Sequence, residues 1–225
     1  MSRPLRAAIF DVDGTLIDSM PIWYDVGARY LRSCGVTPPE ELWRRYFTMG
    51  LEEAAQDMRE QFSLPQPMEE IKQGFLQIVE RFYREEVPLK PGAGNFLKEL
   101  HKAGVPMALA TANTSELANA ALTRLGVLEY FSVTLSCEDF GTTKKEPLVY
   151  RKAAERLGTE PSETAVFEDI LLAVTTAHDA GFCAVAVEDR ASAEEEEQIR
   201  RVADHYISNF SEIPIDAFVS PSSRS

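Results

Sequence analysis

A helical stretch that ends at a glycine, followed by a short apolar run, occurs repeatedly along this chain. A glycine is typical of a helix C-terminus, where the backbone turns through a left-handed conformation. Apolar runs between helices are typical of buried strands in a parallel sheet. The pattern therefore predicts an α/β fold, a Rossmann-like core whose mostly parallel sheet is flanked by helices on both faces. It occurs at Gly104 before 105–111, Gly126 before 132–136, Gly158 before 165–169 and Gly181 before 183–187.

Two carboxylates, Asp11 and Asp13, follow a further apolar run at 7–10. In open α/β sheets, ligands bind outside the carboxyl ends of such strands. An aspartate can accept a phosphoryl group as an acyl phosphate, and a second carboxylate can act as general acid and base when their pKa values differ. We expect Asp11 to be the nucleophile and Asp13 the acid and base, with Gly14 forming the turn. Taken alone, the sequence Asp-x-Asp-Gly is equally compatible with two solvated aspartates.

Polar residues also follow two later predicted strands. Thr111 ends one of them, and the residues after it resemble the start of a helix, whose free N–H groups could bind an anion. Taken alone, this threonine is more typical of a helix cap than of a ligand. Glu168 and Asp169 end another apolar run. These carboxylates are compatible either with a metal site or with ordinary helix N-terminal charge.

Residues 11–16, DVDGTL, closely resemble the first motif of the haloacid dehalogenase superfamily, and residues 141–150 resemble its third motif. Most members of this family are magnesium-dependent phosphohydrolases, and its true dehalogenases lack the second aspartate. The resemblance implies that Thr111 binds the transferring phosphoryl group, together with Ala112 and Asn113. It also implies that Lys144 neutralises the nucleophile and the phosphoryl oxygens, with Lys145 as the alternative.

The cofactor implied by this resemblance is Mg²⁺, which prefers hard oxygen ligands in near-octahedral geometry. Asp11, the backbone carbonyl of Asp13, and Asp169 are the expected direct protein ligands. Glu168 is expected to bind the ion directly or through water. These residues are all expected at strand ends, so the motifs would converge on one site.

The segment between the first two predicted strands is different in character. Apolar residues recur there at helical spacing, without a strand-like run, and prolines at 38, 39, 65 and 67 interrupt the segment. We predict an all-helical cap domain at 17–87, inserted into a catalytic core formed by 1–16 and 88–225. Trp23 is a candidate substrate contact in this cap, with Met20 and Phe47 as further candidates; packing within the cap is the alternative for Trp23.

Composition limits the partners that the chain is expected to have. A formal net charge of −13 argues against nucleic acid and anionic membranes. The N-terminus has no hydrophobic signal-peptide region, and the widely spaced Cys34, Cys137 and Cys183 indicate neither a disulfide framework nor a zinc site. We expect a cytoplasmic enzyme that acts on a small phosphorylated metabolite as a monomer, with a weak homodimer as the alternative.

Three functions remain open at this level. The favoured one is a phosphatase in which water attacks the aspartyl phosphate. A β-phosphoglucomutase-like phosphohexomutase is the alternative, but in that mutase a cap histidine handles protons, and Trp23 occupies the aligned position. The third possibility is a catalytically silent binding module. It is disfavoured because the expected catalytic carboxylates and Lys144 are all present.

Overall fold

The computed structural model describes residues 5–46, 49–112 and 115–218, which form two compact units. Unit 1 comprises Met1–Asp18 and Val87–Ser225, and unit 2 comprises Ser19–Glu86. The sequence-based boundaries were 16/17 and 87/88. Within the described ranges, no helix has both the length and the apolar character needed to cross a bilayer.

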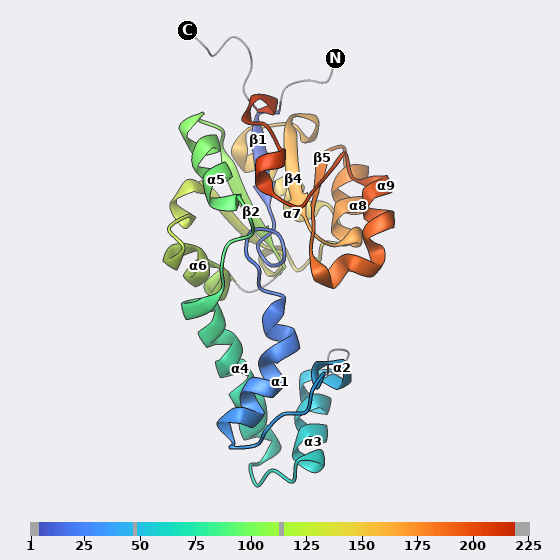
Figure 1. Cartoon of the computed structure of the whole chain (residues 1–225). Helices are drawn as coiled ribbons and strands as arrows, with labels where there is room; N and C mark the ends of the chain where they lie inside the picture. The colour runs from blue at the N-terminus through green and yellow to red at the C-terminus, as the bar shows by residue number, and fades with distance from the viewer. Residues whose placement is uncertain (1–4, 47–48, 113–114, 219–225) are drawn as a thin grey trace. The chain divides into compact units, whose positions relative to one another are not determined.

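Unit 1 is built on a six-stranded parallel sheet with the order β3-β2-β1-β4-β5-β6 (Figure 1). The predicted Rossmann-like α/β fold is therefore confirmed. The sixth strand was not predicted from the sequence. The strands are β1 (Ala7–Phe10), β2 (Met107–Thr111), β3 (Val133–Ser136), β4 (Thr164–Glu168), β5 (Cys183–Val187) and β6 (His205–Ile207).

Helices connect these strands, as the repeated glycine pattern predicts. Gly104, Gly126, Gly158 and Gly181 all have positive φ, between 70° and 89°, so each takes the left-handed turn expected after a helix. The helices are α5 (Ala93–Lys102), α6 (Ser115–Arg124), α7 (Leu148–Leu157), α8 (Leu171–Asp179) and α9 (Glu196–Val202). Short 3₁₀ turns lie at Leu128–Tyr130, Cys137–Phe140, Pro161–Glu163, Arg190–Glu195, Phe210–Glu212 and Ile215–Ala217.

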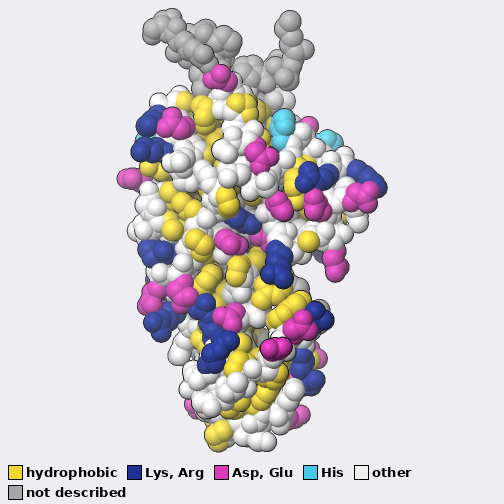
Figure 2. Space-filling model, viewed as in Figure 1, with side chains coloured by type: hydrophobic (Ala, Val, Ile, Leu, Met, Phe, Trp, Pro, Cys, Tyr) yellow, Lys and Arg dark blue, Asp and Glu magenta, His cyan; other side chains and the backbone are white. Residues whose placement is uncertain are grey.

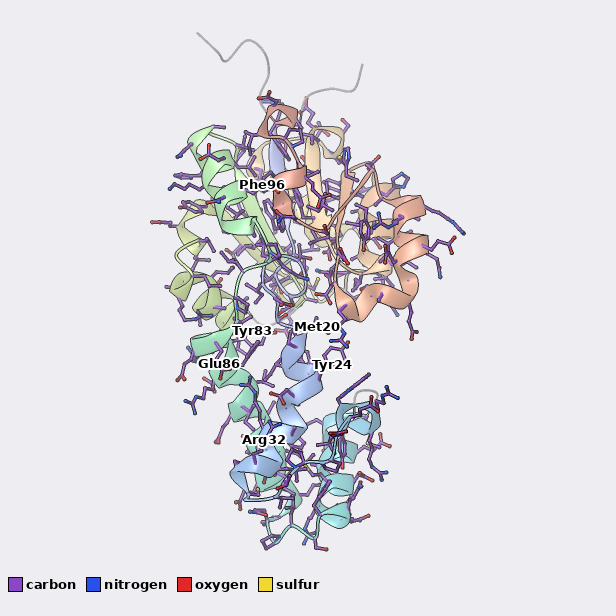
Figure 3. All side chains as sticks on the ribbon, in the orientation of Figure 1. Met20, Tyr24, Arg32, Tyr83, Glu86 and Phe96 are labelled. Atoms are coloured by element: carbon purple, nitrogen blue, oxygen red, sulfur yellow. The ribbon has the colours of Figure 1, made fainter. Side chains whose placement is uncertain are left out.

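Both faces of the sheet are buried. Ile9 belongs to an apolar cluster that includes Tyr150 of α7 and Val174 of α8. The next residue along β1, Phe10, points to the opposite face because side chains alternate along a strand. There its ring stacks on Phe167 at 4.5 Å and meets Phe96 at 6.3 Å edge to face. Figure 3 labels Phe96 on α5. This two-sided burial explains why the strands read as continuous apolar runs.

The regular secondary structure among the described residues of unit 2 is helical. It contains α1 (Pro21–Ser33), α2 (Trp43–Tyr46), α3 (Leu51–Gln61), α4 (Met68–Arg81) and a π-helical turn at Phe82–Glu86. Leu31, Met58 and Ile71 are fully buried between these helices. Gly74 lets α4 approach α1 closely, since a Cβ at this position would overlap the ring of Tyr30.

Charged side chains of both signs are interspersed over the face that Figure 2 shows. Several charged side chains pair at i,i+4 spacing: Arg81 with Glu85 and Arg84 with Glu80 do so where α4 continues into the π-helical turn. Exposed pairs of this kind each contribute little to stability, and salt screens them. The face shown in Figure 2 is therefore of mixed sign, although the net charge of the chain is −13.

Candidate functional site

The loop after β1 positions two of the predicted catalytic carboxylates. The backbone N–H groups of Leu16 and Ile17 both donate to the carbonyl of Val12, at 2.9 and 3.0 Å, which closes a tight turn. Gly14 lies in this turn with φ +77°, and a Cβ there would overlap the carboxylate of Asp169. Both the backbone conformation and this close approach therefore require glycine.

Parallel register aligns the carboxyl ends of β2, β1 and β4. Phe10 pairs with Leu109 of β2 and with Phe167 of β4, and the N–H of Asp11 donates to the carbonyl of Phe167 at 3.0 Å. The residues that follow these pairs, Thr111 and Glu168, end their strands and are buried. Three of the predicted site residues thus lie at one edge of the sheet.

Lys144 is buried among the site carboxylates. Its Nζ forms an ion pair with Asp11 and lies 2.6 Å from Glu168 Oε1. Lys145 is exposed. Of the two lysines left open by the sequence, Lys144 is therefore the one that reaches the carboxylates, because the loop turns its neighbour to solvent.

The acidic pair at the end of β4, Glu168 and Asp169, is held by two hydroxyl groups. Tyr150 of α7 donates to Glu168 Oε1 at 2.7 Å, and Thr15 donates to Asp169 Oδ1 at 3.0 Å. Sequence reasoning assigned neither hydroxyl a role. The available signals were the position of Thr15 inside DVDGTL and of Tyr150 inside the 141–150 motif.

Three buried carboxylates form a cluster suited to a divalent cation. Oxygen atoms of Asp11, Glu168 and Asp169 all lie within 4.8 Å of one another. Glu168 Oε2 is buried and accepts no hydrogen bond from the part of the chain that the structure describes. A hard cation would provide a partner for this oxygen, and carboxylate oxygens are the ligands that Mg²⁺ and Ca²⁺ prefer. The donor set therefore fits a divalent metal.

The electrostatics of the cluster also fit a bound cation. Burial raises the pKa of Asp11 well above its usual value, with Glu168 and Asp169 adding to the rise and Lys144 opposing it. Burial, followed by repulsion from Glu168, raises the pKa of Asp169 to about 7. Burial alone would lower the pKa of Lys144, but attraction to Asp11 and Glu168 outweighs it and raises that pKa. Lys144 alone therefore does not offset the effect of burial and of the neighbouring carboxylates on Asp11 and Asp169.

Comparisons with known proteins identify the family. The family model described as haloacid dehalogenase-like hydrolase matches residues 5–181, which is most of the chain. This chain is a haloacid dehalogenase-like hydrolase.

Relatives of this hydrolase include phosphatases from distant organisms. It is 29% identical over 177 residues to a phosphorylated carbohydrates phosphatase of Thermotoga maritima, covering 79% of this chain and 82% of that protein. It is 32% identical over 196 residues to a "Probable pseudouridine-5'-phosphatase" of Drosophila melanogaster, covering 83% of each. A solved Thermotoga maritima structure, described as a "putative beta-phosphoglucomutase", matches with TM-score 0.78 and 26% identity over 92% of this chain and 96% of that one.

These relatives define the reaction class of the haloacid dehalogenase-like hydrolase. It is a phosphoric monoester hydrolase, a phosphatase. The comparisons do not favour the mutase alternative. The catalytically silent binding module is not supported either, since the chain belongs to a family of hydrolases and matches curated phosphatases.

The structure also describes three further residues of the predicted site, Asp13, Ala112 and Trp23. Asp13 is half-buried in the loop after β1, and Ala112 is exposed at the end of β2. Asn113 and Phe47 lie outside the described residues. Trp23 lies on α1 of unit 2 and is 44% exposed.

A second buried ion pair, which sequence reasoning missed, lies beside the DVDGTL loop of the hydrolase. Lys90 Nζ lies 2.6 Å from Asp189 Oδ2 and donates to the carbonyl of Glu188 at 2.9 Å. The backbone N–H of Lys90 donates to the carbonyl of Leu16 at 2.8 Å. Lys90 thus links the end of the DVDGTL loop to the segment after β5. No sequence motif marks this pair, because its members lie 99 positions apart.

Proposed function

We propose that this hydrolase removes phosphate from a small phosphorylated metabolite through an aspartyl phosphate on Asp11, with Mg²⁺ as cofactor. The observation that carries the proposal is the buried arrangement of Lys144 between Asp11 and Glu168, with Asp169 beside them. A buried carboxylate is a poor nucleophile when it is protonated. The ammonium group of Lys144 favours the ionised form of Asp11 that the attack requires.

In the first half-reaction, Asp11 attacks phosphorus and the bond between phosphorus and the ester oxygen breaks. The electron pair goes to the leaving oxygen, which takes a proton from the carboxyl group of Asp13. In the second half-reaction, the carboxylate of Asp13 takes a proton from water as the water oxygen attacks phosphorus. The bond to Asp11 then breaks, and inorganic phosphate leaves.

The other residues would bind the phosphoryl oxygens, hold the metal or orient the carboxylates. Lys144 and the end of β2, where Thr111 and Ala112 lie, would bind the phosphoryl oxygens. Asp11, the carbonyl of Asp13, Glu168 and Asp169 would hold the metal. When bound, Mg²⁺ would supply positive charge against these carboxylates and the phosphoryl oxygens. Tyr150 and Thr15 orient the two carboxylates to which they donate.

The proposal includes three further expectations from the sequence. Residues 17–87 act as a cap that selects small substrates, Trp23 contacts the substrate, and the enzyme works in the cytoplasm as a monomer. The relatives act on phosphorylated carbohydrates and a nucleoside phosphate, by their names, so both classes belong in the substrate panel.

The test is phosphate release from a panel of sugar phosphates, nucleotides and phosphoglycolate, with Mg²⁺ and with EDTA. We expect Mg²⁺-dependent release that Asp11→Asn abolishes, while Asp179→Asn, an exposed aspartate on α8, retains it. In acid-quenched Asp13→Asn, mass spectrometry should find the phosphorylated peptide that contains Asp11. Release by Asp11→Asn at the wild-type rate would refute the nucleophile. Conversion of β-glucose 1-phosphate to glucose 6-phosphate without free phosphate would refute hydrolysis.

A further inference from the structure

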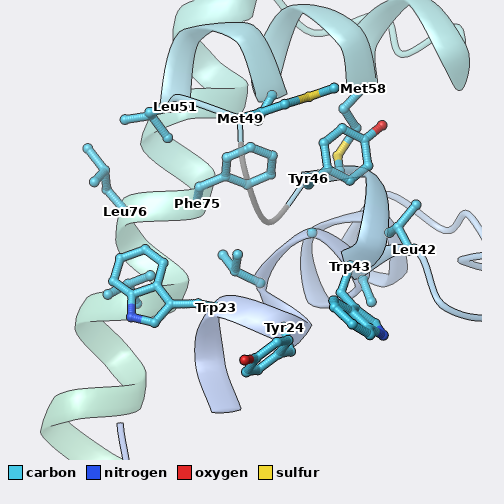
Figure 4. A pocket seen from close by; sticks show the side chains of 15 residues that line it. Trp23, Tyr24, Leu42, Trp43, Tyr46, Met49, Leu51, Met58, Phe75 and Leu76 are labelled. Atoms are coloured by element: carbon cyan, nitrogen blue, oxygen red, sulfur yellow. The ribbon is translucent and has the colours of Figure 1, made fainter. Parts of the chain in front are cut away.

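Unit 2 contains an apolar cavity whose lining includes Trp23, the residue proposed above as a substrate contact. Its volume is about 160 Å³, and it lies among α1, α2, α3 and α4 (Figure 4). Five aromatic side chains line it, and none of its described lining residues carries a charge. The aromatic residues are Trp23, Tyr24, Trp43, Tyr46 and Phe75.

The mouth of the cavity is unusually apolar. Among the described residues, the large hydrophobic side chains that remain exposed are five in number, and three of them line this cavity. These are Trp23 at 44% exposed, Leu51 at 38% and Leu76 at 47%. Single exposed apolar residues are ordinary on a protein surface, but a group of them around a hollow marks an interaction site.

The size and chemistry of the cavity indicate what it can hold. A dry apolar cavity of about 150 Å³ accepts one benzene-sized ring. The rings of Tyr24 and Trp43 meet edge to face at 5.2 Å, the kind of contact that a bound aromatic ring makes with aromatic side chains. A charged or polyhydroxylated ligand would lose its hydration here without charged partners to replace it.

We propose that this cavity is a binding site for a small molecule, or part of one, that carries a single uncharged aromatic ring. The site lies wholly within unit 2 and is separate in chemistry from the charged cluster in unit 1. It binds by burial of apolar surface and by ring contacts.

The chain provides its own probe for this site. Its two tryptophans, Trp23 and Trp43, both line the cavity, so intrinsic tryptophan emission reports on occupancy directly. We would titrate the full-length enzyme with 4-fluorophenol and follow tryptophan emission together with ¹⁹F line width. We expect a saturable change in emission, with glycerol, a compact polyol, producing none.

Two variants test whether the cavity is where the ring binds. Ala54→Leu fills it from α3, and Leu76→Asp places a charge at its mouth; both residues line the cavity. The matched controls are Gln56→Leu and Gln77→Asp, exposed neighbours on the same helices that do not line it. Ala54→Leu should abolish the response, and Leu76→Asp should weaken binding about tenfold, while both controls bind as wild type.

The outcomes separate this proposal from the proposed phosphatase mechanism. Tryptophan binding curves need no turnover, so loss of activity in Asp11→Asn leaves the result for the cavity unchanged. Circular dichroism and a melting curve for each variant verify that unit 2 is folded. A linear, unsaturable response in the wild-type enzyme would refute the proposal. So would equal affinity in Leu76→Asp and Gln77→Asp together with an unchanged response in folded Ala54→Leu.

Discussion

Lys144→Met removes the ammonium group from the buried cluster while keeping most of the side-chain volume. At 2.6 Å and an effective dielectric constant near 20, one such charge pair is worth roughly 6 kcal/mol before desolvation is subtracted. Removing one partner of a buried pair costs about 3–5 kcal/mol, because the other charge stays buried. We expect the free energy of unfolding of the metal-free enzyme to decrease by an amount within that range.

The loss should depend on pH with a definite sign. Without Lys144, the charge that opposes the raised pKa of Asp11 is gone, so the folded variant holds the proton of Asp11 more tightly than the wild type does. Protonated carboxyl groups no longer need the lysine. The destabilisation should therefore be larger at mildly alkaline pH than at mildly acidic pH. In kcat, we expect a fall of about 10²–10³-fold, as for the loss of one preorganised charge-stabilising group.

The assay is urea denaturation in EDTA, followed by far-ultraviolet circular dichroism. Tryptophan emission is unsuitable, because both tryptophans lie in unit 2 and Lys144 lies in unit 1. Lys145→Met is the matched control, since that lysine is exposed, and it should change stability by less than about 0.5 kcal/mol. A loss below about 1 kcal/mol in Lys144→Met, or an equal loss in the control, would refute the electrostatic account of this cluster.

Other predictions test the loop, the second ion pair and a buried thiol. Gly14→Ala should lower kcat at least tenfold and weaken the binding of Mg²⁺, since a Cβ would overlap the carboxylate of Asp169. Gly104→Ala, which has similar positive φ but open space, should cost only about 1 kcal/mol of stability and leave kcat unchanged; equal kinetics in the two would contradict the overlap. Lys90→Met should cost about 3–5 kcal/mol in urea denaturation, and adding Asp189→Asn should recover part of it; additive losses would show that the pair is not coupled. Burial raises the pKa of Cys183 from 9.0 to about 11. Its alkylation, measured by mass spectrometry, should therefore accelerate up to about pH 11, and its contribution to stability should fall as the pH rises from 9.0 to about 11. Alkylation at neutral pH as fast as in the unfolded chain would refute this.

Much of unit 1 follows from local patterns in the sequence. A glycine after each helical stretch and an apolar run after each glycine predicted the alternation of helices and strands, because backbone preferences and side-chain periodicity act over a few residues. The same holds for the loop at DVDGTL, where Gly14 must adopt positive φ. Strand ends collect ligands in such sheets. The sequence could therefore indicate Asp11, Glu168 and Asp169 as candidates for one site.

Contacts between distant segments were decided by the tertiary structure. Neighbouring Lys144 and Lys145 are chemically equivalent in the sequence, and only the path of the folded loop buries the first and exposes the second. Tyr150 reaches Glu168 because α7 packs on the sheet in one particular register. Lys90 and Asp189, and likewise the helices around the cavity in unit 2, meet through strand order and helix packing. Those depend on the summed free energy of many non-local contacts, which no short stretch of sequence contains.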